Sequence, residues 1–100
     1  MKTTIKEENQ NYIMTFEGRL DTPSSVQVGR DMRTLYNCEG HDIILDCTAL
    51  VYITSSGLRL FLDLLKVAKG KGSKVTIVGL SNELHEVFDE VGFTNLFEIR

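Results

Sequence analysis

The stretch Val51-Tyr52-Ile53-Thr54-Ser55-Ser56-Gly57-Leu58 joins a short apolar run to a strongly apolar helical pattern through three consecutive hydroxyl residues. This composition predicts that the apolar run stops at the hydroxyl cluster and that a helix begins near Ser56. The three hydroxyls would then lie at a helix N-terminus, where the first backbone N–H groups lack partners within the helix. A hydroxyl there either caps the helix or, once phosphorylated, places a strongly negative group at the positive end of the helix dipole.

The helix predicted from Ser56 to Gly70 is apolar around more than half of its circumference. At 100° per residue, the face that must cover a sheet carries Leu58, Phe61, Leu62, Leu65 and Ala68. A second apolar sector consists of Leu60, Leu64 and Val67. A helix with one face in solvent needs a narrower stripe. The second sector therefore either packs against a neighbouring helix or docks a partner protein.

Outward from this helix, strands and helices alternate along the chain. The expected strands cover residues 3–7, 12–17, 42–47, 74–78 and 96–99. A polar loop at residues 8–11 joins the first two strands, and residues 18–21 are expected to form a turn. Thr22 is expected to cap one helix, with Pro23 as its first helical residue, and Ser81 to cap another that stops at Gly92.

The resulting order is β-β-α-β-α-β-α-β. Helical crossovers force the strands they join to be parallel, whereas the opening hairpin is antiparallel. Residues 1–100 show no linker, repeat or low-complexity segment. We therefore predict a single α/β domain over residues 1–100, with a mixed, mostly parallel sheet.

Composition narrows the function. The chain has 100 residues and a formal net charge of −3, which argues against nucleic-acid binding because that usually rests on a basic surface. No apolar run is long enough to span a bilayer and no export signal begins the sequence. Cys38 and Cys47 form no CxxC pair, so reduced thiols in a cytoplasmic protein are the simplest account. No cofactor or metal site is predicted, because the cysteine, histidine and acidic residues lack ligand spacing.

Two other classes of function fit the sequence poorly. A serine enzyme would need a base near its nucleophile, but there is no G-x-S-x-G elbow, and His41 and His85 fall on the wrong elements. The run Lys69-Gly70-Lys71-Gly72-Ser73 follows a helix, whereas a phosphate-binding P-loop follows a strand. We therefore expect a binding module and not an enzyme.

The chain resembles the STAS domain, the module shared by bacterial anti-sigma factor antagonists and the cytoplasmic tails of sulfate transporters. The resemblance rests on Gly18-Arg19-Leu20-Asp21, which is similar to the family's G-x-L-D, on Ile44-Leu45-Asp46, and above all on Ser55-Ser56-Gly57-Leu58. It covers nearly the whole chain, from the opening hairpin to Phe97. Many members carry a further helix after the last strand, whereas this sequence ends at Arg100.

In anti-sigma factor antagonists the usual pattern is Asp-Ser-Ser/Thr-Gly-Leu, and the serine after the Asp is phosphorylated by an anti-sigma factor with kinase activity. By this resemblance Ser55 is the phosphorylated residue. Thr54 stands where the family has Asp, which adds Thr54 as an alternative acceptor. The predicted partner-binding residues are Asp21, Thr54, Ser56, Gly57, Leu60 and Leu64.

Several of these residues have a plainer interpretation. In this interpretation Asp21 caps the helix that starts near Thr22, Ser56 is an N-cap or first-turn residue, and Gly57 only permits close helix–sheet packing. The resemblance also allows a different function, since stand-alone STAS domains serve as accessory subunits of lipid or anion transporters. In that case Ser55 would be an unphosphorylated contact residue.

Overall fold

A five-stranded sheet with strand order β1-β2-β3-β4-β5 forms the centre of the protein, as seen in a computed structural model that describes residues 1–100. The strands are β1 (Lys2–Glu8), β2 (Asn11–Leu20), β3 (Asp42–Ile53), β4 (Val75–Val78) and β5 (Glu98–Ile99). β1 is antiparallel to β2, and all other neighbouring pairs are parallel. The predicted element order and the mixed sheet are confirmed.

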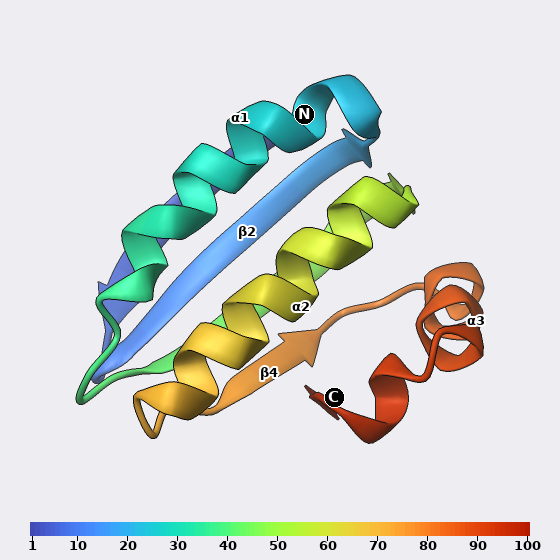
Figure 1. Cartoon of the computed structure of the whole chain (residues 1–100). Helices are drawn as coiled ribbons and strands as arrows, with labels where there is room; N and C mark the ends of the chain where they lie inside the picture. The colour runs from blue at the N-terminus through green and yellow to red at the C-terminus, as the bar shows by residue number, and fades with distance from the viewer.

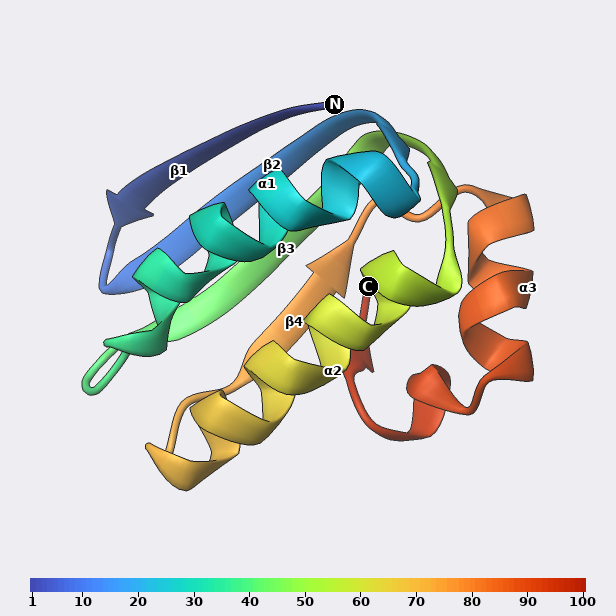
Figure 2. The same cartoon turned by 45° about the horizontal axis from the view of Figure 1, so that its top comes forward.

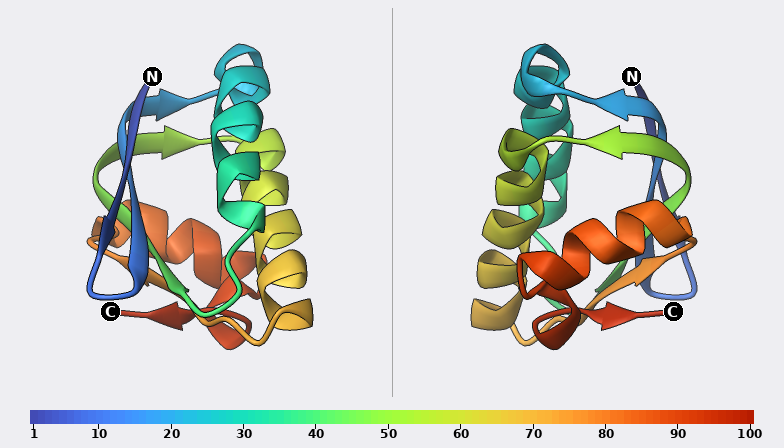
Figure 3. Two further views of the ribbon diagram at one scale, coloured as in Figure 1. Left: turned by 90° about the vertical axis from the view of Figure 1, so that its left-hand side faces the viewer. Right: turned by 90° about the vertical axis from the view of Figure 1, so that its right-hand side faces the viewer.

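The helices are α1 (Thr22–Arg33), α2 (Ser55–Gly70) and α3 (Asn82–Glu90), with short 3₁₀ segments η1 (Thr34–Tyr36) and η2 (Phe93–Asn95). Two of them, α1 and α2, lie side by side on one face of the sheet (Figures 1 and 3), whereas α3 lies beyond the end of β4. None of the helices is long and apolar enough to cross a membrane.

The predicted turn at residues 18–21 is wrong, because β2 continues to Leu20. The strand absorbs the turn-like residues as irregularities in its pairing with β3, one of them between Gly18 and Arg19, and Gly18 has a φ of 107° that a glycine tolerates. The hairpin loop is also shorter than expected. Asn9 and Gln10 both have positive φ, which is typical of a two-residue turn.

One helix cap differs by one position from the prediction, and another is confirmed. Asp21, not Thr22, is the N-cap of α1, and Pro23 is the second residue of that helix. Ser81 caps α3 as predicted, accepting a hydrogen bond from the Leu84 N–H at 3.2 Å.

A chain of aromatic contacts joins the sheet to the helices. It runs through Phe16, Phe61, Phe88, Phe93 and Phe97, with successive ring centroids 5.2, 5.8, 5.8 and 5.3 Å apart. Phe61 belongs to α2 and Phe93 to η2, so this packing fixes the segment after α3 beside α2. Aromatic rings at these separations stabilise the folded state by more than the burial of their surface area alone.

The second apolar sector of α2 faces α1. Leu64 is fully buried. Leu60 is half-buried, and its Cδ2 atom lies 3.2 Å from the point where a Cβ at Gly29 of α1 would stand. Leu64 therefore follows the alternative in which this sector packs against a neighbouring helix. It belongs to the core and presents no surface to a partner.

Candidate functional site

The hydroxyl cluster and Asp21 lie at the same edge of the sheet because β2 and β3 end together. Leu20 pairs with Ile53, and the Leu20 carbonyl accepts hydrogen bonds from the Thr54 N–H at 3.0 Å and the Thr54 hydroxyl at 3.3 Å. Parallel strands that stop at one level bring the following residues of each strand together. Asp21 and Thr54, which are distant in sequence, therefore begin neighbouring helices.

Thr54 is the N-cap of α2, but its side chain does not cap the helix. Its hydroxyl donates to the Leu20 carbonyl instead, and no side chain caps the backbone N–H groups of the first turn. By contrast, α1 and α3 have side-chain caps from Asp21 and Ser81. The first turn of α2 also contains no acidic residue. Its free N–H groups and the helix dipole therefore favour a negative charge there.

Ser55 is the first residue of α2 and is exposed, whereas Thr54 and Ser56 are half-buried. The predicted helix start at Ser56 is thus one residue late, and Ser56 is a first-turn residue. Of the three hydroxyls, Ser55 is the most accessible to another protein.

Gly57 allows this turn of α2 to approach the sheet closely. A Cβ at Gly57 would stand 2.7 Å from Leu20 Cγ and 2.8 Å from Ile53 Cγ1, closer than such atoms come in proteins. The interpretation of Gly57 as a residue that permits tight helix–sheet packing therefore fits the structure. Because Leu20 and Ile53 are the last residues of their strands, Gly57 lets the first turn of α2 lie against the ends of β2 and β3.

Asp21 forms a capping box with Ser24. Its Oδ1 atom accepts from the Ser24 N–H at 3.0 Å, and the Ser24 hydroxyl accepts from the Asp21 N–H at 3.0 Å. The backbone hydrogen bond from Ser24 is the main cause that lowers the pKa of the Asp21 carboxyl. The predicted capping role of Asp21 is confirmed. Asp21 remains partly exposed.

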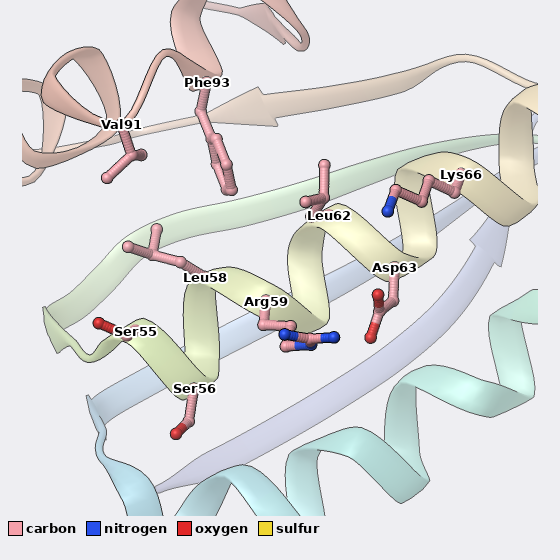
Figure 4. Close-up of a pocket in the computed structure, with 9 residues that line it drawn as sticks. All are labelled: Ser55, Ser56, Leu58, Arg59, Leu62, Asp63, Lys66, Val91 and Phe93. Atoms are coloured by element: carbon pink, nitrogen blue, oxygen red, sulfur yellow. The ribbon is translucent and has the colours of Figure 1, made fainter.

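An open groove of about 490 Å³ extends from Ser55 along α2. Figure 4 shows Leu58 and Leu62 of α2 pointing toward Val91 and Phe93 on the segment that follows α3. Charged groups also line it, namely Arg59, Asp63 and Lys66. Val91 is 49% exposed, which leaves an apolar surface beside the candidate site.

Sequence reasoning missed this groove. Its lining combines Arg59, Asp63 and Lys66 of α2 with Val91, the residue that follows α3. The groove joins residues that are more than thirty positions apart, so helical periodicity along one element gives no signal for it. Phe93, which lines the groove opposite α2, is held there by its aromatic contacts with Phe88 and Phe97.

The family model for the STAS domain matches residues 2–100. An anti-sigma-B factor antagonist of Listeria monocytogenes is 28% identical over 96% of this chain and 85% of its own length.

Solved structures share the fold at lower identity. An anti-sigma factor antagonist STAS domain protein of Planctomyces limnophilus superposes with a TM-score of 0.89 at 14% identity, covering 98% of this chain and 87% of that one. The phosphorylated form of the Bacillus cell fate determinant SpoIIAA gives 0.76 at 17% identity, covering 99% and 91%.

Proposed function

This chain belongs to the STAS domain family, and on that premise we propose that it is an anti-sigma factor antagonist controlled by phosphorylation of Ser55. In this proposal the unphosphorylated protein binds an anti-sigma factor that is also a kinase. The kinase transfers a phosphoryl group to Ser55, and the phosphorylated form releases the partner. The protein acts by binding and performs no catalysis of its own.

The observation that carries the proposal is the exposed Ser55 hydroxyl at the uncapped first turn of α2. The relatives with this function support it, as does a fold shared with a protein whose structure is described in a phosphorylated form. Thr54 is a weaker candidate acceptor, because it is half-buried and its hydroxyl bonds to the Leu20 carbonyl.

The fold should tolerate the modification. Phosphorylation adds about −1.5 to −2 charges. At a helix N-terminus a negative group is favoured by about 0.3–2 kcal/mol. Since the first turn of α2 has no acidic residue to repel the new group, modification should leave the domain folded.

The same charge acts against binding. In a docked interface the phosphate would be buried, and an uncompensated buried charge costs several kcal/mol. A cost of about 4 kcal/mol corresponds to roughly a thousandfold loss of affinity. The switch would thus act on association and leave the structure nearly unchanged.

We propose that the partner surface surrounds Ser55. It includes Asp21, Thr54 and Ser56 at the sheet edge, together with the backbone at Gly57 and the exposed part of Leu60. Leu64 is omitted because it is fully buried. The groove residues Arg59 and Val91 extend this surface, since they line the same depression as Ser55.

The test compares Ser55→Ala, Ser55→Asp and the wild-type protein as baits in extracts of the native cell, with captured proteins identified by mass spectrometry. We expect the wild type and Ser55→Ala to retain a kinase-like protein and Ser55→Asp to lose it. Thr54→Ala is the matched control and should still accept phosphate at Ser55. Equal capture by Ser55→Ala and Ser55→Asp, or recovery of transporter subunits with Ser55 unmodified, would contradict the proposal.

A further inference from the structure

β1 leaves one edge of the sheet without a hydrogen-bonding partner. It is the outermost strand of the sheet, pairs only with β2, and nothing lies beyond it in Figure 2. It has seven residues and is exposed along nearly its whole length. A long open edge presents a row of backbone N–H and C=O groups that another strand can pair with.

The hairpin register decides which backbone groups face outward. Asn9 and Gln10 form a two-residue turn, so the flanking pair Glu8 and Asn11 exchanges two hydrogen bonds. Hydrogen-bonded and non-bonded pairs alternate along an antiparallel ladder. The N–H and C=O groups of Thr3, Ile5 and Glu7 therefore point away from β2, toward the open edge.

The side chains of β1 separate by face. The Thr3 hydroxyl donates to Asp31 of α1 at 2.6 Å, which places the odd-numbered side chains on the helix side. The even-numbered residues Lys2, Lys6 and Glu8 lie on the other side, where Lys6 and Glu8 form an exposed ion pair at 3.2 Å. Positive charge thus begins the strand and negative charge ends it.

This pattern is complementary to itself. In an antiparallel pair of β1 strands centred on Ile5, Lys2 faces Glu8 of the second copy at both ends of the pair. Thr3 then faces Glu7, and Ile5 faces Ile5. The N–H and C=O groups of Thr3, Ile5 and Glu7 are directed at the other copy. Opposite charges directly across an antiparallel pair stabilise it, and like charges destabilise it.

The neighbouring registers lack this complementarity. A shift by two residues in one direction places Lys2 opposite Lys6, and a shift in the other direction places Lys6 opposite Lys6. A shift by one residue would set the outward N–H and C=O groups of one strand opposite residues whose own N–H and C=O groups point toward β2. Lysines on an edge strand often oppose association, but in the register centred on Ile5 the terminal lysine meets a glutamate.

We propose that two copies of this chain associate through antiparallel pairing of their β1 strands about a two-fold axis at Ile5. The product is one continuous sheet with five strands from each copy and with the helices of both copies on the same face. Ile5, which is 38% exposed in the single chain, meets its counterpart at the centre. β1 and β4 are separated by two strands, and the groove beside Ser55 lies on the β4 side of α2, so both Ser55 sites stay open in the dimer.

The decisive experiment exchanges charges between the two ends of β1 and measures mass by sedimentation equilibrium over a concentration series. Lys2→Glu alone and Glu8→Lys alone each create two like-charge pairs per dimer, so the dissociation constant should rise by roughly tenfold. An equimolar mixture of the two variants restores both pairs in a heterodimer. We expect that mixture to dimerise as the wild type does.

Ile5→Pro gives an independent test. The Ile5 N–H points away from β2, so proline removes no hydrogen bond of the domain but blocks the central pair of the dimer. We expect a folded monomer, with the fold checked by circular dichroism and urea unfolding. A wild type that stays monomeric at the highest concentration, or a mixture no more dimeric than its two components alone, would overturn the proposal.

Discussion

Replacing Gly57 by alanine should destabilise the protein, although alanine is the better helix former. The added Cβ would stand 2.7 Å from Leu20 Cγ, 2.9 Å from Leu20 Cδ2 and 2.8 Å from Ile53 Cγ1. Leu20 is fully buried and Ile53 is 6% exposed, so neither side chain has free space to move into. Overpacking of this kind costs about 1–3 kcal/mol. The gain in helix propensity is at most about 1 kcal/mol.

The net expectation for Gly57→Ala is a loss of up to about 2 kcal/mol in the free energy of unfolding. For a domain of this size, each kcal/mol lowers the melting temperature by roughly 4–8 °C. Urea unfolding followed by circular dichroism measures the loss. Gly70→Ala is the matched control, because a Cβ at Gly70 in the last position of α2 would meet nothing within 4 Å. If Gly57→Ala were as stable as Gly70→Ala, close contact between α2 and the strand ends could not explain the glycine.

Three further predictions test other parts of the fold. Gly79→Ala should cost about 3 kcal/mol or more of unfolding free energy in urea titrations, because Gly79 has a φ of 78° and its Cβ would stand 2.1 Å from Thr48 Oγ1. His41, whose pKa is raised above the ordinary 6.5 mainly by its hydrogen bond to Glu7, stabilises the folded state fully below that value and loses this contribution as pH rises through the raised pKa. Thermal melts across this range should show the decline in the wild type and a flatter profile in Glu7→Gln. Cys47, buried and with its pKa raised by burial to about 12, should resist thiol reagents until urea unfolds the chain, which a colorimetric thiol assay will detect.

Much of the fold could be predicted because local and tertiary preferences agree. Ile43 and Leu45 in the apolar run of β3 are fully buried, and the Ser81 cap and the Gly92 stop both lie at the ends of α3. Where the prediction failed, pairing overrode local signals. Gly18 and Arg19 read as a turn in isolation, but β3 extends to Ile53 and offers β2 a partner up to Leu20.

The candidate site was predictable in part for the same reason. The hydroxyl cluster indicates the start of a helix, and Asp21 lies at the same sheet edge as this cluster because the parallel strands β2 and β3 end together. The exposure of each apolar side chain of α2 could not be predicted from the sequence. Leu64 and Leu60 lie on one sector of the helix, yet they differ in exposure. That difference depends on where α1 lies, and its approach at Gly29 is visible only in three dimensions.

Thr54 departs from the family pattern, and the geometry around it suggests what the change does. An Asp at an N-cap accepts a hydrogen bond from the first helical turn and adds negative charge there. Thr54 does neither, since its hydroxyl donates to the Leu20 carbonyl and the turn stays uncapped. A phosphate on Ser55 would therefore meet free N–H groups without repulsion from a neighbouring carboxylate. Thr54→Asp should raise stability through a new cap while reducing the gain that Ser55→Asp brings to the same turn, and urea unfolding of the single and double variants measures both effects. Additive effects of the two substitutions would show that they do not share the N-terminus of α2.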